Sequence, residues 1–237
     1  MDLMSSPHPN SLRSYRIAAI LPVYNEERGV QEVLRVLQEV PTIHEVIVVD
    51  DGSQDRSMQI ILQSQQSDPR MRLVVHPRNQ GKGRAVYSGL CYTQAQLIVM
   101  LDADLRGLCA CHVEDLVLPM VAEQLDMTIG IFRRGKFYSD FSHWATPWLS
   151  GQRCIWRKNL ERICWRAAEG YGLETALTVA SLRYKWKCKK VIWAGVSHLP
   201  SEMHRGFFAG LLNRAKMYSQ IGRAFLLASL YTESRSH

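Results

Sequence analysis

Residues 98–108, IVMLDADLRGL, place two acids, Asp102 and Asp104, directly after an apolar run. The run is typical of a buried strand, and two neighbouring carboxylates at its end repel each other unless a counter-charge lies nearby. Both side chains can reach one point if they flank a turn at Ala103. Oxygen ligands suit Mg²⁺ or Mn²⁺, and Mg²⁺ is usually shared between one or two carboxylates and substrate phosphates. The acid pair therefore predicts a metal site that also binds a nucleotide diphosphate.

The first half of the chain alternates strand-like and helix-like patterns. Short apolar runs are followed by segments with apolar residues at helical spacing, and Pro22 is expected to end the first run. Strands separated by helices predict an α/β fold, with a mostly parallel central sheet and helices on both faces. The strand-like runs are residues 16–24, 44–53, 71–77 and 95–104.

Polar residues follow each of these predicted strands. In parallel sheets ligands bind beyond the carboxyl ends of the strands, so these residues are expected to share one rim. Lys82 at that rim is expected to face a phosphate, although a solvated lysine at a helix start has the same pattern. The rim clusters are residues 24–26, Asp50 with Asp51, residues 79–82, and Asp102 with Asp104.

The second half of the chain is less regular. Residues 127–134 are typical of a strand, and residues 148–158 hold a turn at Ser150 and Gly151 followed by basic residues. A helix that carries Glu174 is expected within residues 170–186, and a strand over 189–198 ends at His198. The last stretch, 204–231, is basic, aromatic and helical in pattern.

Net charge and the distribution of apolar residues indicate the class of partner and the cellular location. A net charge of +7 favours anionic partners. No apolar run approaches the ~20 residues that span a bilayer, and the N-terminus lacks a signal-peptide centre, so we expect a cytoplasmic protein. We predict a flexible lead over residues 1–15, one catalytic domain over 16–205 and a helical segment over 206–237.

The six cysteines show no disulfide framework, and in a cytoplasmic chain we expect reduced thiols. Cys109, Cys111 and His112 form a C-x-C-H cluster. This cluster lacks the second ligand pair of a zinc module, so we interpret the cysteines as structural or incidental.

Several other classes are disfavoured by their missing motifs. The turn NQGKGRA is not a P-loop, and PVYNEERG replaces the G-x-G-x-x-G of a Rossmann dehydrogenase. Nucleotidyltransferases open on a glycine-rich basic loop, which ILPVYNEE is not. The basic charge suggests nucleic acid, but no known module or basic-aromatic face supports that partner.

Four motifs in this order, LPVYNEE, IVVDDGSQDRS, NQGKGRAVYSGL and LDADL, resemble glycosyltransferase family 2 of the GT-A fold. The resemblance covers residues 17–205. It implies that Pro22, Tyr24 and Glu26 contact the nucleotide and that Asp51 binds the base or ribose. It also implies that Asp102 and Asp104 hold a metal on the diphosphate of the sugar nucleotide.

Two subfamilies share features with the second half. SGQR at 150–153 is similar to the acceptor-side motif of polyprenyl-phosphate sugar transferases, although Arg106 stands where those enzymes commonly have glutamine. GYGLETALT followed by GVSH looks closer to glucosyl-3-phosphoglycerate synthase and its relatives. That resemblance implies Glu174 beside the acceptor and His198 as a further metal ligand, with His204 as the other candidate.

The resemblance implies an inverting, metal-dependent glycosyltransferase that moves a hexose from a UDP- or GDP-sugar, UDP being favoured. For an acceptor hydroxyl, Glu174 is the expected general base. A polyprenyl phosphate acceptor is already ionised, and Glu174 would then orient a sugar hydroxyl. In both cases Lys82 and Arg153 would neutralise the leaving diphosphate. A sugar-nucleotide-binding protein without turnover is the third interpretation. A homodimer and a peripheral membrane contact are left open.

Overall fold

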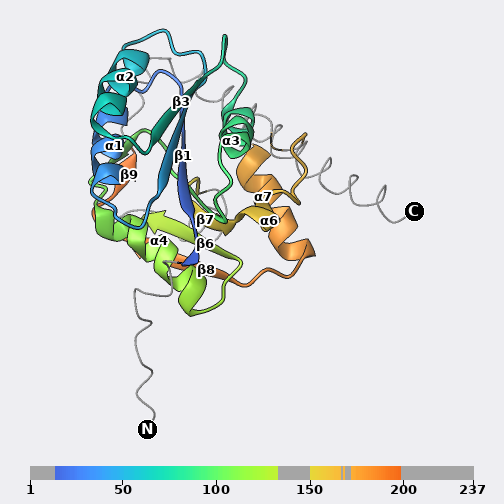
Figure 1. Cartoon of the computed structure of the whole chain (residues 1–237). Coiled ribbons are helices and arrows are strands. Elements are labelled where there is room, and N and C mark those ends of the chain that lie inside the picture. Colours follow the sequence, from blue (N-terminus) through green and yellow to red (C-terminus); the bar gives the residue numbers. More distant parts are fainter. Residues whose placement is uncertain (1–13, 133–149, 167, 169–171, 199–237) are drawn as a thin grey trace, which may run out of the picture.

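The computed structural model of the protein describes residues 14–132, 150–166, 168 and 172–198. The chain alternates strands and helices through its first half (Figure 1). The strands are β1 (Ile17–Val23), β2 (Glu45–Asp50), β3 (Met71–Val75), β4 (Leu97–Met100), β5 (Leu105–Arg106), β6 (Met127–Phe132), β7 (Arg153–Trp156), β8 (Cys188–Trp193) and β9 (Ser197–His198). The helices are α1 (Val30–Gln38), α2 (Ser57–Ser67), α3 (Lys82–Cys91), α4 (Ala110–Ala122), α6 (Arg157–Leu160) and α7 (Gly172–Arg183).

Seven of these strands form one sheet in the order β3-β2-β1-β4-β7-β6-β8. The pairs β3-β2, β2-β1, β1-β4 and β6-β8 are parallel, whereas β7 runs antiparallel to both β4 and β6. The short strands β5 and β9 pair with each other outside this sheet. The predicted α/β fold with a mostly parallel sheet is confirmed.

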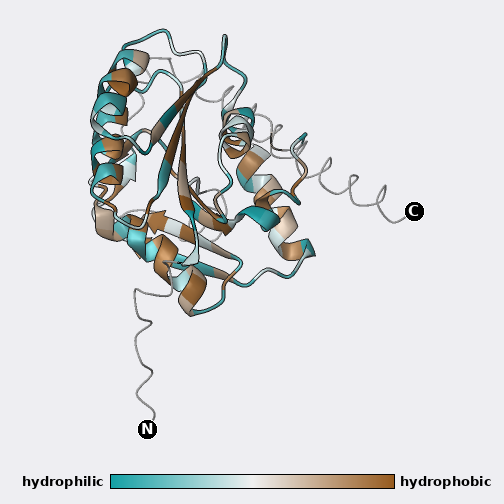
Figure 2. Ribbon diagram, viewed as in Figure 1, coloured by the Kyte–Doolittle hydropathy of each residue, from teal (hydrophilic) through white to brown (hydrophobic). Residues whose placement is uncertain are grey.

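Each face of the sheet buries its own apolar layer. One layer packs α1 and α4 against alternate residues of β1, among them Ile17 and Leu21. The other packs α3 and α7 against Ala18 and Ile20, the residues between. Figure 2 shows apolar residues along the central strands and polar residues on the outward sides of α1 and α2. This alternation follows from the two-residue period of a strand, and it explains why the strands read as continuous apolar runs.

Strand β1 continues through Pro22 to Val23, so the expectation that Pro22 ends it is wrong. The backbone of Ile20 faces β4, since its carbonyl accepts a hydrogen bond from the N–H of Leu101. Two residues later, the nitrogen of Pro22 faces the same side, beyond the end of β4 at Met100. The missing proline N–H therefore costs the sheet no hydrogen bond.

The reversal of β7 positions part of the functional site. In the antiparallel pairing Arg153 lies opposite Met100, and Trp156 lies opposite Leu97. The chain thus enters β7 at the rim where β4 ends, which brings residues 150–152 beside Asp102. An additional parallel strand would have placed its start at the opposite edge of the sheet.

Other predictions from the sequence have mixed outcomes. No element is predicted above for residues 105–126, where the structure has β5 and α4. Cys109 and Cys111 form a disulfide, so the expectation of reduced thiols is wrong for this pair. The other four cysteines are free thiols.

The predicted segment boundaries stay predictions. Residues 1–13 of the expected lead, the expected helical segment 206–237 and His204 lie outside the described residues. Within the described part of the chain, no helix combines the length and apolar character needed to cross a bilayer.

Candidate functional site

Asp102 follows β4, and its two carboxylate oxygens have different partners. Oδ1 lies 2.6 Å from Nζ of Lys82, and Oδ2 accepts a hydrogen bond of 2.7 Å from Nε2 of Gln152. Burial alone would raise the pKa of Asp102, but the charges of Lys82 and His198 and the Lys82 and Gln152 hydrogen bonds outweigh it and lower the pKa. The nearest counter-charge of Asp102 is therefore a lysine.

Asp104 meets His198 because β5 pairs with β9. Leu105 lies opposite His198 in that pairing, and Nδ1 of His198 lies 2.9 Å from Oδ1 of Asp104. The hydrogen bond to Asp104 raises the pKa of His198 above its ordinary value, and the charges of Asp104 and Asp102 add to this effect. One potential ligand atom from each of Asp102, Asp104 and His198 lies within 4.8 Å of the other two. The structure thus brings the three predicted metal ligands together.

Glu26 adds a third carboxylate at this rim. It lies in the turn after β1, where its backbone N–H donates to Oγ of Ser57 over 2.8 Å. Burial raises the pKa of Glu26 to about 7, and the charges of Asp104, Asp102 and Asp55 contribute to the increase. Burial is the main cause of this increase, and the neighbouring carboxylates add to it, so Glu26 lies among negative charges.

Lys82 joins the two halves of the site. Its Nζ lies 2.6 Å from Asp102 and 2.7 Å from Oε1 of Glu174, which is in the first turn of α7. Burial alone would lower the pKa of Lys82, but the charges of Asp102 and Glu174 raise it above its ordinary value. The expected contact of Lys82 with a phosphate stays a prediction, because in this structure its ammonium binds two carboxylates.

Asp51 fixes the turn that delivers Lys82. Its buried carboxylate accepts the backbone N–H groups of Gln80 (2.9 Å) and Gly81 (2.7 Å) and lies 2.7 Å from Nδ1 of His76. Gly81 has a φ of 91°, a conformation that favours glycine, and α3 begins at the next residue. The predicted contact of Asp51 with a base or ribose stays a prediction.

The SGQR stretch lies directly against this ion-pair cluster. An added Cβ at Gly151 would contact Nζ of Lys82 and would lie 2.5 Å from Oδ2 of Asp102, so a larger residue here requires these two side chains to shift. Arg153 is fully buried, and its Nε donates to the carbonyl of Ser150 over 2.9 Å. Burial lowers the pKa of Arg153 to about 10, against the opposing charge of Glu174. Its proposed contact with a diphosphate stays a prediction.

The remaining predicted nucleotide contacts are at the open side of the rim. Pro22 is half-buried in β1, and Tyr24 is 43% exposed in the turn that follows. Neither side chain is needed to fill the core at this point, so both are accessible to a ligand. Their role in nucleotide binding stays a prediction.

Sequence reasoning missed two contributors to the site. Gln152 was read only as part of SGQR, although its amide binds Asp102, and His76 was not singled out although it binds Asp51. The available signal for Gln152 was its neighbour Gly151, since a glycine in a turn before a strand often marks a close approach. His76 had no comparable signal.

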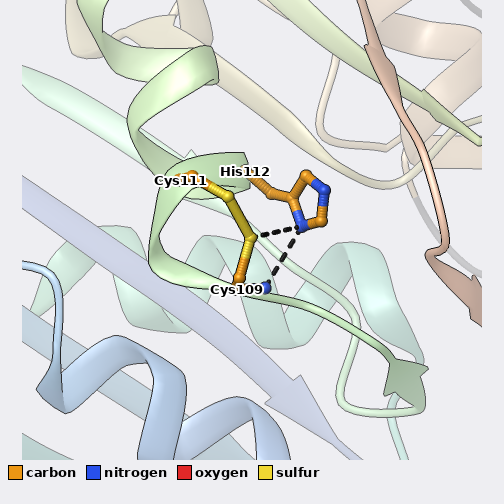
Figure 3. Close-up of side chains that lie close together, drawn as sticks. All are labelled: Cys109, Cys111 and His112. Atoms are coloured by element: carbon orange, nitrogen blue, oxygen red, sulfur yellow. Dashed lines mark hydrogen bonds between the residues drawn. A yellow bond between two sulfur atoms is a disulfide. The ribbon is translucent and has the colours of Figure 1, made fainter.

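A second group of metal-ligand side chains lies at the start of α4. Cys109, Cys111 and His112 each offer an atom within 4.8 Å of the other two (Figure 3). These donors are two sulfurs and an imidazole, whereas the rim group has two carboxylates and an imidazole. The two groups therefore suit different classes of metal.

The rim group fits Mg²⁺ or Mn²⁺. Two hard carboxylates and one imidazole are donors that such ions accept, and Glu26 adds a third carboxylate whose pKa the charges of Asp102 and Asp104 help to raise. A bound ion would share Asp102 with Lys82 and Gln152, so the site has few protein ligands and leaves room for phosphate oxygens.

Comparison with known families agrees with the motif order. The family model described as Glycosyl transferase family 2 matches residues 18–176. The uncharacterized glycosyltransferase YkcC of Bacillus subtilis is 37% identical over 98 residues, which is 40% of this chain and 30% of the relative. Undecaprenyl-phosphate 4-deoxy-4-formamido-L-arabinose transferase of Salmonella choleraesuis is 30% identical over 97 residues, 39% of this chain and 30% of the relative. The chain thus matches about 30% of the length of these curated relatives.

Solved structures match over most of the chain. Glucosyl-3-phosphoglycerate synthase from Mycobacterium tuberculosis, in complex with Mn²⁺, uridine-diphosphate and phosphoglyceric acid, has a TM-score of 0.75 at 22% identity, covering 92% of this chain and 80% of that one. The complex with Mg²⁺ and uridine-diphosphate has a TM-score of 0.74 at 22% identity, covering 92% and 81%. At this identity the likeness establishes the fold.

Proposed function

Because the chain belongs to glycosyl transferase family 2, we propose that it transfers a hexose from a nucleotide-diphosphate sugar to an acceptor hydroxyl, with inversion at the anomeric carbon. A UDP-sugar is the favoured donor, and solved structures of the same fold were obtained with uridine-diphosphate. The observation that carries the proposal is the convergence of Asp102, Asp104 and His198 at one point of the rim.

Asp102, Asp104 and His198 are the residues that would hold Mg²⁺ or Mn²⁺. A bound divalent ion supplies positive charge to the diphosphate of the donor and to the leaving nucleotide. Lys82, 2.6 Å from Asp102, adds a second positive charge at the same place. The carboxylates of Asp102 and Asp104 would repel a diphosphate, and these cations would offset that repulsion.

Glu174 is the proposed general base. Its carboxylate is largely buried, with 10% of the side chain exposed, and Lys82 holds it 2.7 Å from Nζ. In the reaction the acceptor oxygen bonds to the anomeric carbon while its proton passes to Glu174. The bond from that carbon to the phosphate oxygen breaks, and the nucleotide diphosphate leaves with the electron pair. Release of Lys82 from Glu174 toward the phosphate would free the base.

A polyprenyl phosphate is the second candidate acceptor. The curated relatives include enzymes named as transferases to undecaprenyl phosphate, and SGQR lies against Asp102 at the rim. A phosphate oxygen is already ionised at neutral pH, so this reaction has no proton to remove. Glu174 would then hold a sugar hydroxyl of the donor.

The test compares donors and acceptors with the purified chain and either Mg²⁺ or Mn²⁺. UDP-glucose and GDP-mannose are each offered with 3-phosphoglycerate and with a polyprenyl phosphate, and the product is measured by mass spectrometry. Glu174→Gln is run beside wild type. Glu39→Gln is the matched control, because Glu39 is in an exposed ion pair with Arg35 whose loss changes little.

The results separate the three interpretations. Product on the hydroxyl that falls by at least about 100-fold in Glu174→Gln, and not in Glu39→Gln, supports the general base. Product on the lipid phosphate that survives Glu174→Gln assigns the second acceptor. A rise in melting temperature with UDP and Mn²⁺ but no product with any pair indicates a binding protein without turnover and contradicts the proposal.

A further inference from the structure

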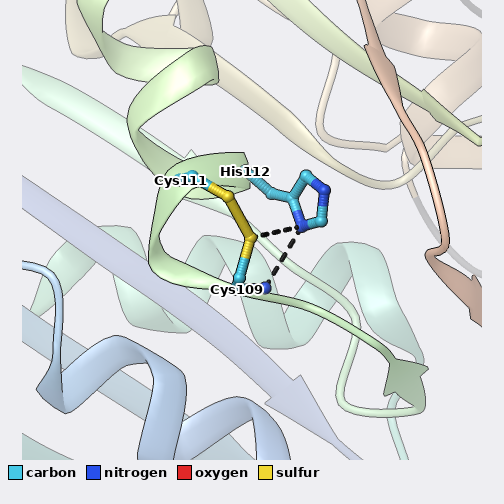
Figure 4. The surroundings of a disulfide bond; sticks show 3 residues. All are labelled: Cys109, Cys111 and His112. Atoms are coloured by element: carbon cyan, nitrogen blue, oxygen red, sulfur yellow. Dashed lines mark hydrogen bonds between the residues drawn. A yellow bond between two sulfur atoms is a disulfide. The ribbon is translucent and has the colours of Figure 1, made fainter.

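The first turn of α4 carries a group of sulfur and imidazole ligands that shares no residue with the ligands proposed at the rim. Cys109 precedes the helix, and Cys111 and His112 are in its first turn, with Cys109 and Cys111 joined by a disulfide (Figure 4). Sγ of Cys109 lies 3.0 Å from Nδ1 of His112. Cys111 is exposed, whereas Cys109 and His112 are half-buried, so solvent reaches the group from one side.

The imidazole of His112 is held in one tautomer, with Nδ1 turned toward Cys109. Its Nδ1 accepts the backbone N–H of Cys109 over 3.1 Å, so the ring proton is on Nε2. The backbone carbonyl of Ala194 accepts a hydrogen bond from the His112 ring. The centroid of this ring lies 5.3 Å from that of the Trp193 ring. A histidine ligand typically donates its second nitrogen to a backbone carbonyl in this way.

Two thiolates and one neutral imidazole form a donor set with a clear preference. Soft sulfur ligands with imidazole favour Zn²⁺ over Mg²⁺ or Ca²⁺. We propose that, once the disulfide is reduced, Nδ1 of His112 exchanges its hydrogen bond from the Cys109 N–H for a zinc ion, which Cys109 and Cys111 also bind, with water as the fourth ligand.

The disulfide and the zinc site exclude each other. Two thiolates on one tetrahedral zinc, with Zn–S bonds of about 2.3 Å, are too far apart to be bonded to each other. Oxidation by a peroxide removes two electrons from the two thiolates, forms the S–S bond and releases the metal. The peroxide takes these electrons and two protons and becomes two waters. Reduction by a thiol or phosphine restores the two sulfur ligands.

The same contacts also close the first turn of the helix, so the experiment must separate capping from metal binding. Serine is a good N-cap residue and glutamine is a good partner three residues later, so Cys109→Ser and His112→Gln preserve the cap while each removes a ligand. Cys91→Ser is the matched control, because Cys91 is an exposed free thiol on α3.

The experiment measures zinc binding by the full chain, reduced with a phosphine, against a chromophoric chelator. Excess Mg²⁺ and UDP are present to occupy the rim site. We expect one zinc per chain for wild type and Cys91→Ser. A loss of at least about 100-fold in affinity is expected for Cys109→Ser, Cys111→Ser and His112→Gln, since even outer contacts of a metal ligand contribute 10- to 100-fold.

Two further measurements on the wild type need no substitution. Co²⁺ in place of zinc should give a sulfur-to-cobalt charge-transfer band, which carboxylate ligands do not produce. Peroxide treatment should release the metal, and the phosphine should restore it. Absence of stoichiometric zinc in the reduced protein, absence of the sulfur band, or equal binding by the oxidised protein would each overturn the proposal.

Discussion

Gly151 is the residue whose size most directly controls the proposed site. A methyl group at this position would contact the ends of the Lys82 and Asp102 side chains and displace them. Gly151→Ala should therefore push the lysine away from the carboxylate. We expect at least a tenfold fall in affinity for UDP with Mn²⁺, the equivalent of about 1.4 kcal/mol, measured by calorimetry.

The melting temperature provides the control for that substitution. Lys82 and Asp102 are partly exposed, and their side chains can shift, so the fold should keep its stability within about 1 kcal/mol. Unchanged affinity for UDP in Gly151→Ala would show that the ion pair beside Gly151 is not part of the donor site.

At the scale of the residue, the order of the motifs predicted which residues could bind a metal, but not which side chains contact them. Asp102, Asp104 and His198 were all predicted as metal ligands, and the structure brings them within reach of one ion. The partners of Asp102 were not predicted, because Lys82 and Gln152 reach it from α3 and from the start of β7. These contacts cannot be predicted from sequence spacing until the order of the strands in the sheet is known.

At the scale of the element, Arg70 holds the end of α1. Its guanidinium donates to the carbonyls of Leu37 and Gln38 in the last turn and to those of Val40 and Ile43 beyond it. Lysine cannot reproduce this fork, so Arg70→Lys should lower the free energy of unfolding by about 2 kcal/mol. Urea denaturation measures this free energy. The control is Arg35→Lys, in an exposed ion pair, whose free energy of unfolding should lie within about 0.5 kcal/mol of wild type.

Asp68 supports Arg70 and gives this element a pH dependence. Hydrogen bonds from Arg70 hold the pKa of Asp68 below its ordinary value. The carboxylate therefore stabilises the fold above its unfolded pKa, about 3.9, and this stability is lost as pH falls through the lower folded pKa. Asp68→Asn should flatten the loss of stability below pH 4. An unchanged slope would show that Asp68 does not contribute.

The elements divide into those with a readable pattern and those without one. The four strands of the first half were predicted within about four residues of their observed ends, because buried parallel strands are continuous apolar runs. Strand β7 was missed, since four residues that begin with a buried arginine do not resemble a strand. Helix α4 contains Pro119, a residue that usually indicates a helix end. Strands β5 and β9 have two residues each, too few for a sequence pattern, so their pairing depends on the tertiary structure.

At the scale of the whole molecule, the charge of +7 favours anionic partners, and an anionic membrane surface is one of them. The basic, aromatic residues 204–231 are the expected contact and lie outside the described residues. Replacing Arg214, Lys216 and Arg223 by glutamate removes two units of charge at each position, which lowers the net charge from +7 to +1. Co-sedimentation with phosphatidylglycerol vesicles should weaken about 100-fold, at about 1 kcal/mol per basic residue.

A variant of equal charge distinguishes a local contact from a general one. Arg56, Lys185 and Lys187 are exposed within the described residues, and their replacement by glutamate also gives +1. This control should bind vesicles much better than the first variant. Equal loss in both would show that only the overall charge matters, and no binding by wild type would remove the membrane contact altogether.

The strand order also has a consequence for synthesis on the ribosome. Strands β1, β2 and β3 are consecutive in the chain and can pair as soon as they emerge, but β7 must enter between β4 and β6, and β8 must follow to cover β6. Contacts across such long sequence separations form late. Gln152, Glu174 and His198 all arrive after this point, so a nascent chain that has exposed only its first 150 residues has a partly folded sheet and no assembled site. Stalled chains of increasing length should therefore acquire protease resistance well before they acquire affinity for a nucleotide.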